Sequence, residues 1–368
     1  MNLAAKACIR PRISTAARPA VTRTRVHRHA ASALAAALIG IATVFTVTTA
    51  VAQSRLDTVR QRGILLCGSH QGLAGFGIPD AQGNWTGFDV ELCRAVAAAI
   101  FDDPRKVRFV PLSAKDRFTA LQSGDVDVLS RNTTWTMSRD TQLGLDFAAV
   151  TYYDGQAFMV RNKLAIASAK ELNGASICVA QGTTNELNVA DYFRAAGWKY
   201  QVVTFATNEE TIKAYDSGRC DSITSDASTL ASQRLVLANP TEHAVLPDII
   251  SKEPLGPVVR HGDNQWADII RWTHMAMVNA EELGISRDNV DDMKRSTNPE
   301  IKRLLGTEGK FGEAIGLSND WAYRIIKHIG NYGESFERNL GGGSPLRTPR
   351  GLNALWSRGG LQYGIPVR

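Results

Sequence analysis

Two short stretches of the chain, about ninety residues apart, end in polar side chains that could bind a small polar molecule. Residues 122–130 read Gln-Ser-Gly-Asp-Val-Asp-Val-Leu-Ser, and residues 216–226 read Asp-Ser-Gly-Arg-Cys-Asp-Ser-Ile-Thr-Ser-Asp. In each stretch a glycine follows a helical pattern, and glycine is common just past a helix because it tolerates the left-handed backbone. A short apolar strand follows the glycine. We therefore interpret each stretch as one helix-to-strand unit of an α/β sheet.

The elements around the two stretches predict two similar lobes. Strands are expected at 63–68, 107–112, 156–160, 177–180, 202–205 and 245–250, with mostly extended chain at 140–153 and 255–259. Helices are expected at 88–100, 116–122, 185–196, 208–216, 265–283 and 320–330. In open α/β sheets, ligands bind beyond the carboxyl ends of the strands. Two lobes that each present a polar strand end therefore predict one ligand in a cleft between them.

The first 52 residues are typical of a secretory signal peptide. They contain seven Lys or Arg residues and no acid, followed by an apolar run at 33–47 and a small-x-small site at Ala50-Val51-Ala52. A membrane anchor is the alternative, but this run is shorter than the roughly 20 residues that a spanning helix needs. We expect export to the periplasm with cleavage after Ala52.

Removal of this leader changes the charge of the protein. The whole chain carries +6, and the leader holds seven cations and no acid, so the remaining 316 residues carry −1. A basic surface for nucleic acid is therefore not expected. The remaining length suits two domains of ordinary size.

Four cysteines remain after the leader, two in each half: Cys67, Cys93, Cys178 and Cys220. An even number in an exported chain favours disulfides. We predict one bridge per lobe, Cys67–Cys93 and Cys178–Cys220, although four cysteines allow three pairings and buried free thiols are the alternative. A zinc site is not expected, because no Cys-x-x-Cys and no histidine pair at helical spacing occurs.

Several motifs, in order, resemble the extracytoplasmic solute-binding proteins of family 3, which serve polar amino-acid ABC importers. Residues 85–92 (Trp-Thr-Gly-Phe-Asp-Val-Glu-Leu) are similar to the Gly-Phe-Asp-Val-Asp-Leu signature, and 121–127 to the Leu-Gln-Ser-Gly-x-x-Asp element. Residues 146–155 resemble the first inter-lobe crossing, and 181–184 and 221–226 resemble binding loops of the second lobe. The resemblance covers residues 56–330. The cysteines and the tail at 349–356 are similar to the general L-amino-acid-binding branch, which accepts many side chains.

This resemblance implies a two-lobed periplasmic-binding-protein fold (type II), with two crossover strands and a hinged cleft. It predicts a first lobe at 53–155 and 257–340, a second at 156–256, and a C-terminal extension at 341–368 packed on the body. The implied protein is a monomer that binds an L-amino acid and docks on permease subunits and, through them, an ATPase. No cofactor, metal or catalytic residue is expected, and the chain has no Gly-x-x-x-x-Gly-Lys-Ser/Thr loop for ATP.

An amino acid carries a carboxylate and an ammonium, and a protein that buries them must pair both. Arg139 stands where the family keeps an arginine, and its planar fork can donate two hydrogen bonds to the carboxylate. Thr134 and Asn132 would add donors from the same loop. Thr184 begins a helix, whose free N–H groups favour anions, although it could be a simple N-cap. Asp226 is assigned to the ammonium, with a helix N-cap as the alternative.

The loop after the first strand is expected to contact the ligand side chain. His70 and Leu73 stand at positions similar to those that meet the side chain in relatives, and Phe76 lies nearby. Relatives selective for basic amino acids carry an acid at the position of His70, so the histidine argues against a strict Lys or Arg preference. A histidine is more often structural than ligand-binding, and that alternative stays open.

Two other classes of function remain as alternatives. A periplasmic enzyme on this fold, such as a prephenate-type dehydratase, would need a positioned acid or base near the reacting carbon, with His70 or Asp89 as candidates. A sensor subunit would bind an amino acid only to signal. Neither is expected, because nothing in the chain demands a catalytic group and no output segment is present.

Overall fold

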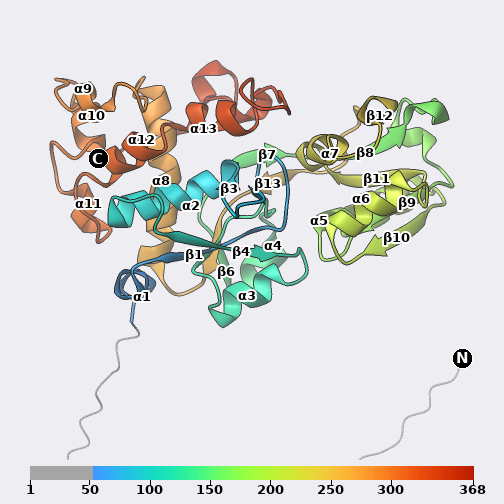
Figure 1. Ribbon diagram of the computed structural model, residues 1–368, viewed down its shortest axis with the longest axis horizontal. Coiled ribbons are helices and arrows are strands. Elements are labelled where there is room, and N and C mark those ends of the chain that lie inside the picture. Colours follow the sequence, from blue (N-terminus) through green and yellow to red (C-terminus); the bar gives the residue numbers. More distant parts are fainter. Residues whose placement is uncertain (1–52) are drawn as a thin grey trace, which may run out of the picture. The chain divides into compact units, whose positions relative to one another are not determined.

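The computed structural model describes residues 53–368, and the predicted signal peptide, residues 1–52, lies outside the described residues. The described part contains two α/β lobes, each built on one five-stranded sheet, as expected. Figure 1 shows the elements of the second lobe, in yellow-green, gathered apart from those of the first.

The sheet of the first lobe has the strand order β4-β1-β5-β14-β6. β1 runs parallel to β4 and β5, whereas β14 runs antiparallel to β5 and β6. All six residues of β1 are buried, as in a strand covered on both faces. The strands are β1 (Leu65–His70), β4 (Val107–Leu112), β5 (Val128–Leu129), β6 (Leu145–Phe147) and β14 (Val258–Arg260). The helices are α1 (Arg55–Arg62), α2 (Phe88–Phe101), α3 (Arg117–Ser123), α4 (Met137–Thr141), α8 (Asn264–Glu282), α9 (Val290–Met293), α10 (Pro299–Leu304), α11 (Phe311–Ala314), α12 (Trp321–His328) and α13 (Tyr332–Asn339), with a small hairpin of β2 (Ile78–Pro79) and β3 (Trp85–Thr86).

The sheet of the second lobe repeats this plan with the order β10-β9-β11-β8-β12. β9 runs parallel to β10 and β11, whereas β8 runs antiparallel to β11 and β12. The strands are β8 (Gln156–Arg161), β9 (Ser176–Ala180), β10 (Gln201–Phe205), β11 (Ser222–Asp226) and β12 (His243–Val245), and the helices are α5 (Thr184–Ala196), α6 (Asn208–Asp216) and α7 (Ala227–Arg234).

The two similar stretches at 122–130 and 216–226 occupy equivalent places, because β5 and β11, which they contain, are each the third strand of their sheet. An aspartate in each stretch holds the neighbouring parallel strand. Asp127 Oδ2 accepts a hydrogen bond from the backbone N–H of Leu66 (2.7 Å), and Asp221 Oδ2 accepts one from that of Ser176 (2.8 Å). Asp127 also pairs with Arg55 and Arg62 of α1. These acids of the repeated pattern therefore hold strands together at the end of the sheet opposite to the polar strand ends.

Two short strands connect the lobes. β7 (Tyr152–Asp154) leads from the first sheet into β8, β13 (Glu253–Leu255) leads back to β14, and the two pair antiparallel. The prediction of a mostly extended chain at 140–153 missed α4, which Thr136 caps by accepting a hydrogen bond from the N–H of Arg139. The strand predicted at 245–250 was also wrong. β12 ends at Val245, and Pro247 has no N–H to continue the ladder.

Both disulfides form between the predicted partners. Cys67 of β1 is bonded to Cys93 of α2, and Cys178 of β9 is bonded to Cys220, which stands just before β11. Each bridge therefore lies within one lobe and joins the second strand of its sheet, β1 or β9, to another segment of the same lobe.

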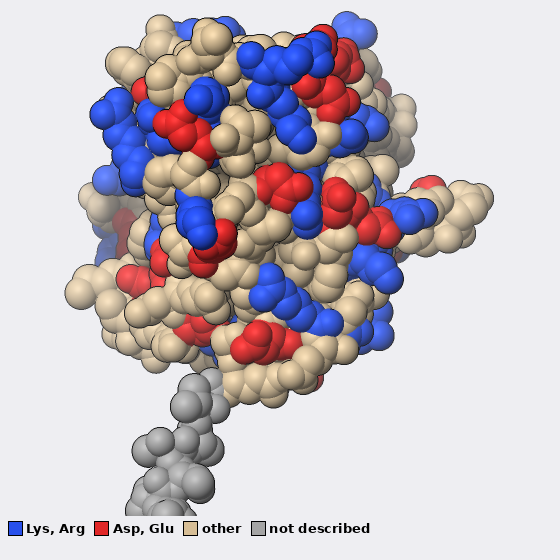
Figure 2. All heavy atoms as spheres, turned by 90° about the vertical axis from the view of Figure 1, so that its left-hand side faces the viewer, with Lys and Arg blue, Asp and Glu red and all other residues tan. Residues whose placement is uncertain are grey.

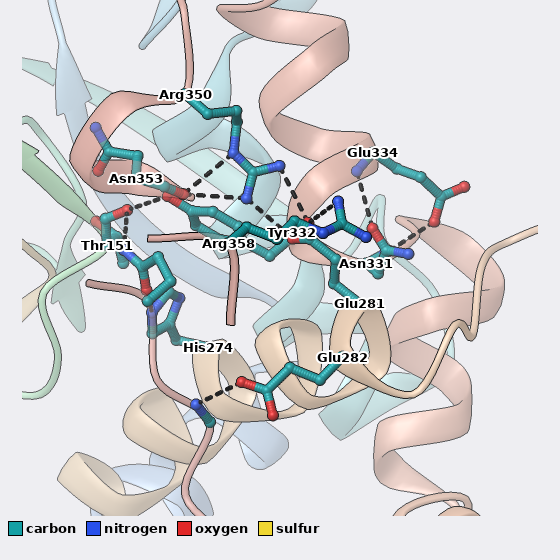
Figure 3. Close-up of polar contacts among 12 residues, drawn as sticks. Thr151, His274, Glu281, Glu282, Asn331, Tyr332, Glu334, Arg350, Asn353 and Arg358 are labelled. Atoms are coloured by element: carbon teal, nitrogen blue, oxygen red, sulfur yellow. Dashed lines mark hydrogen bonds and ion pairs between the residues drawn. The ribbon is translucent and has the colours of Figure 1, made fainter. Parts of the chain in front are cut away.

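The tail after Leu340 lies against α8, α13 and the first crossover strand. Asn353 holds both backbone groups of Tyr153 in β7: its Oδ1 accepts from the N–H (2.7 Å) and its Nδ2 donates to the carbonyl (3.1 Å). Arg350 pairs with Glu281 (3.1 Å) and lies 5.1 Å from the ring centre of Tyr332. Figure 3 shows the three side chains together. The tail therefore braces one of the two strands that connect the lobes.

The surface of the first lobe mixes charges of both signs. On the face that looks out from the left side of Figure 1, Lys and Arg alternate with Asp and Glu, and no single sign dominates (Figure 2). Within residues 53–368, none of the helices combines the length and the apolar composition that membrane spanning requires.

Replacing Asn353 with alanine should destabilise the protein through the crossover strand. The Asn353→Ala variant leaves two backbone groups of Tyr153 without their partners, so we expect the free energy of unfolding to fall by about 1–3 kcal/mol. Urea unfolding measures this change. Leu352→Ala, at a side chain that is 55% exposed, is the matched control and should change stability by less than about 0.5 kcal/mol. Equal stability of the two variants would contradict the bracing role.

Candidate functional site: a polar cavity between the lobes

A small cavity lies where the two lobes meet, and polar side chains from both lobes line it. The first lobe contributes the start of α3 and the loop after β5, and the second contributes the starts of α5 and α6 and the end of β11. The lining residues are Ala114, Arg117, Arg131, Asn132, Thr134, Thr183, Thr184, Asn185, Asn208, Ser225 and Asp226. β5 and β11 thus both have their carboxyl ends at the cavity. Ligands of open α/β sheets bind at such strand ends.

Three buried arginines supply positive charge on the first-lobe side. Arg131 donates through Nε to the carbonyl of Leu112 (2.9 Å), and burial lowers its pKa to about 10. Burial also lowers the pKa of Arg139 to about 10, and its Nη1 donates to the carbonyl of Thr134 (2.9 Å). Burial and the other two arginines lower the pKa of Arg117, whose Nε has no hydrogen-bond partner. A guanidinium with an unused donor, buried beside a cavity, is suited to an anion.

Asp226 supplies negative charge on the second-lobe side. It stands at the N-cap position of α7 but makes no capping hydrogen bond, and its Oδ1 instead accepts from Asn185 Nδ2 (2.8 Å). Burial raises its pKa well above the usual value, and the nearby carboxylates of Asp154 and Glu253 raise it further. No three His, Cys, Asp or Glu side chains of the described part are grouped as metal ligands. The cavity therefore places a buried anion opposite buried cations.

Glu253, on the second crossover strand, joins the two lobes through its carboxylate. Its Oε2 accepts hydrogen bonds from Thr134 of the first lobe (2.6 Å) and Thr184 of the second (2.8 Å). Its Oε1 accepts from Asn188 (2.7 Å) and Ser251 (2.6 Å). With four donors and only 1% exposure, this carboxylate is fully satisfied inside the protein.

The lobes are close together in this structure. Asn132 Nδ2 donates to Thr229 (3.4 Å), and Ser232 Oγ donates to the carbonyl of Ala74 (2.8 Å), each across the lobe boundary. The cavity volume is about 20 Å³, which is room for about one water molecule. Any ligand of amino-acid size therefore needs the lobes to separate or the cavity side chains to move.

The loop that carries Asn132 and Thr134 is held by Asp89, near the start of α2. One carboxylate oxygen of Asp89 accepts from the N–H of Asn132 (2.7 Å) and the other from Ser130 (3.3 Å). Burial raises the pKa of Asp89 to about 6. Asn132 has a φ of 33°, in the left-handed region that asparagine tolerates better than most residues. Asp89 thus positions a loop of the cavity.

Four of the eight predicted ligand-binding residues line this cavity: Asn132, Thr134, Thr184 and Asp226. Thr183, and not Thr184, caps α5, because its side chain accepts a hydrogen bond from the N–H of Glu186. The hydroxyl of Thr184 instead donates to Glu253. Arg139 is buried behind the lining, over the ring of Phe118 (5.2 Å).

None of the three residues predicted to meet the ligand side chain lines this first cavity. His70 and Leu73 line a second cavity beside the first. The N–H of Gly72 donates to His70 Nδ1 (3.1 Å), and His70 Nε2 lies 3.0 Å from Asn208 Nδ2. Burial and the cations of Arg131 and Arg117 lower the pKa of His70, which keeps it neutral. Phe76 lines neither cavity and packs edge-on against Tyr152 in the core.

Reasoning from the sequence missed five residues that shape the site. Arg131 directly follows the first echoed strand, so its position was a usable signal. The other four come from the starts of helices or from the crossover strand, and only the fold brings them together: Arg117, Asn185, Asn208 and Glu253.

The family model of bacterial extracellular solute-binding proteins, family 3, matches residues 65–284. The chain belongs to this family. It is 58% identical to the general L-amino acid-binding periplasmic protein AapJ of Rhizobium johnstonii, over 91% of this chain and 99% of the relative. It is 56% identical to the glutamate/glutamine/aspartate/asparagine-binding protein BztA of Rhodobacter capsulatus, over 88% and 96%.

A solved structure agrees with the sequence relatives. An ABC transporter periplasmic binding protein from Brucella ovis, with glutathione bound, has 61% sequence identity and a TM-score of 0.85, covering 86% of this chain and 100% of that one. This family 3 member is the substrate-binding component of an ABC importer, with permease and ATPase subunits as partners. Its close relatives are named as binding proteins and not as enzymes, which agrees with the expectation that the chain is not an enzyme.

Replacing Asp226 with asparagine should stabilise the protein in the absence of ligand. The raised pKa means that the ionised carboxylate is disfavoured in the fold at neutral pH, and Asn can still accept from Asn185. We expect Asp226→Asn to raise the free energy of unfolding at pH 7 by roughly 0.5–2 kcal/mol, as single stabilising substitutions do. The gain should shrink as the pH falls through the raised pKa, because wild-type Asp226 then becomes protonated and its cost disappears. Urea unfolding at pH 7 and pH 4 measures both effects.

Asp221, at the other end of the same strand, is the matched control. Hydrogen bonds from the side chain and the backbone of Ser176 lower its pKa, so its ionised form stabilises the fold. Asp221→Asn should therefore lower stability at pH 7. The stabilising contribution of the wild-type carboxylate is present above the unfolded pKa and is lost as the pH falls through the lower folded value. A similar loss of stability in both variants would contradict the unfavourable burial of Asp226.

Proposed function

We propose that this protein binds free L-α-amino acids of many kinds for import, by their common head group. The observation that carries the proposal is the opposition of charges across one cavity, with Arg117 and Arg131 on the first lobe and Asp226 on the second. An α-amino acid has a carboxylate and an ammonium a few ångströms apart. A cavity that pairs both charges recognises every amino acid through its head and leaves the side chain unconstrained.

The carboxylate would bind the first lobe and the ammonium the second. Arg139, Arg117 and the hydroxyl of Thr134 would donate to the carboxylate, with the start of α5 at Thr184 adding donors, since buried carboxylates need several hydrogen bonds. Asp226 would accept from the ammonium. In the structure, Glu253 accepts from the hydroxyls of both threonines. A ligand carboxylate would take over these donors, or share them, when it enters.

The ligands of the relatives support recognition by the head group. One relative is named for general L-amino acids, another for glutamate, glutamine, aspartate and asparagine, and the Brucella ovis structure holds glutathione. Glutathione is a γ-glutamyl peptide, so its glutamate keeps a free α-carboxylate and a free α-ammonium. The three ligand sets therefore share one head group, and we include γ-glutamyl peptides among the candidate ligands.

Capture would proceed by closure of the lobes. The first lobe binds the carboxylate in the open form, and the second adds its contact to the ammonium only when the lobes meet. The ligand therefore shifts the equilibrium toward the closed form. We infer further that the mature protein begins after Ala52, acts in the periplasm as a monomer, and presents its closed form to the permease.

A thermal-shift screen of residues 53–368, stripped of bound ligand, tests this proposal. The probes are the twenty L-amino acids, their D-isomers and prephenate. Many L-amino acids should stabilise the protein, by roughly 2.7 kcal/mol when present at about 100 times the dissociation constant. Asp226→Ala and Arg139→Ala should abolish the shifts, whereas Leu352→Ala should keep them. A shift with prephenate alone, or with no amino acid, would refute the proposal.

The affinity for amino acids should also fall as the pH falls. The ammonium of the ligand favours ionised Asp226, so binding below the raised pKa of the unliganded protein must release a proton. We expect weaker binding at pH 5 than at pH 7.5, with a proton released at pH 5. Calorimetry in two buffers of different ionisation enthalpy measures that proton. An affinity that rises toward acid would contradict the assignment of Asp226.

A further inference from the structure

The second cavity also lies between the lobes, and the proposed binding of the amino-acid head group gives it no role. The loop after β1 lines it on one side, and the start of α6 and the end of α7 line it on the other. Its volume is about 400 Å³, within the range of roughly 300–1,000 Å³ typical of ligand sites. The head-group cavity has room for only about one water molecule, so the second cavity is much the larger of the two.

One contact separates the two cavities. Asn208 lines both of them, and its side-chain amide meets His70 across the lobe boundary at 3.0 Å. Burial and the nearby arginines lower the pKa of His70, so its ring is neutral and has one N–H donor and one acceptor nitrogen. An imidazole N–H and a carboxamide are suited to the carbonyl and the N–H of an amide bond. A ligand that crosses this boundary would therefore be well matched if it carried an amide there.

The chemistry of the second cavity suits a short peptide. Leu73, Ile212 and Val236 give it apolar walls, and Gln233 gives it a polar group. Gln233 is only 6% exposed, and its Oε1 has no hydrogen-bond donor. A buried amide oxygen without a donor is unfavourable, and a peptide N–H would supply one.

A cation stands at the wall of the same cavity. Lys213 pairs with Glu209 at 2.6 Å, and both side chains are more than two-thirds exposed, so the pair adds little to stability. Lys213 can therefore exchange this partner for the terminal carboxylate of a peptide at small cost.

We propose that the second cavity is a subsite for the amide-linked tail of γ-glutamyl peptides, whose α-amino-acid head lies in the first cavity. This inference rests on the proposed function, because it places the head where a free amino acid would bind. The γ-amide crosses between His70 and Asn208, the peptide N–H groups reach Gln233, and the terminal carboxylate reaches Lys213. Free amino acids place their head at the first cavity, after the lobes separate or the cavity side chains move, and do not need the tail subsite, so one protein takes both classes.

Two neighbouring residues allow a matched test of the tail subsite. Val236 lines the second cavity and is 68% exposed, whereas Leu235 does not line it and is 40% exposed. Val236→Trp would fill the subsite, and Leu235→Trp adds the same ring one residue away. The Gln233→Leu variant removes the amide with little change of volume. All three leave the head-group residues in place.

The measurement is calorimetric titration of residues 53–368 with two probes, L-glutamine and S-methylglutathione. The methyl group blocks thiol exchange with the two disulfides. The probes should compete in the wild-type protein. Val236→Trp should weaken S-methylglutathione at least tenfold and L-glutamine less than twofold, Gln233→Leu should weaken S-methylglutathione about fivefold, and Leu235→Trp should change neither.

Other outcomes separate failure of the subsite from failure of the head-group site. Wild-type protein that binds L-glutamine but not S-methylglutathione overturns the subsite and leaves the proposed function intact. Equal effects of Val236→Trp and Leu235→Trp, or binding of the two probes together, also overturn it. Wild-type protein that binds no free L-amino acid overturns the proposed function and, with it, the assignment of the tail to the second cavity.

Discussion

The carboxylate of Glu253 is the point at which both lobes and the crossover strand meet. It is buried, and each of its four hydrogen bonds comes from a different side chain, one in the first lobe and three in or beside the second. A buried carboxylate must keep such partners, because leaving it unpaired is very costly. Any movement of the lobes must therefore break some of these bonds and replace them. In the proposed function this constraint would link binding to closure, since an incoming carboxylate would compete with Glu253 for the hydroxyls of Thr134 and Thr184.

The buried charges of the cavity are not fully paired with each other in the unliganded protein. Arg117 has a buried donor without a partner, and Asp226 has a raised pKa beside two other acids. Each of these features costs stability in the unliganded protein. A zwitterionic head group would pair both. The structural acids of the repeated pattern, Asp127 and Asp221, show the contrast, because their hydrogen bonds are complete without any ligand.

The C-terminal extension connects this site to the rest of the first lobe. Asn353 holds β7, the strand that pairs with the strand of Glu253. Gln362 donates to the carbonyls of Val150 and Thr151 (3.3 and 3.2 Å), just before β7. The tail therefore holds β7 through Asn353, and the side chains beside the cavity hold β13 through Glu253. A tail with no evident motif in the sequence acquires a structural role through contacts that only the fold reveals.

The sequence by itself determined most of the local elements and the two-lobed plan, because glycine stops, apolar periodicity and the doubled helix-to-strand pattern are properties of neighbouring residues. It left three pairings of the four cysteines open, and the fold shows which pairing forms. The sequence also singled out Asp226 and Thr184 as candidates, because Asp226 ends a strand and Thr184 begins a helix, and both line the first cavity. Only the tertiary structure decided which charges share a cavity. Arg117 and Asp226, which line the same cavity, stand 109 positions apart in the chain, and no local pattern relates them. The sequence named His70 and Leu73, but only the fold shows the second cavity that they line, since it is formed by two lobes whose facing surfaces are set by packing and by the crossover strands.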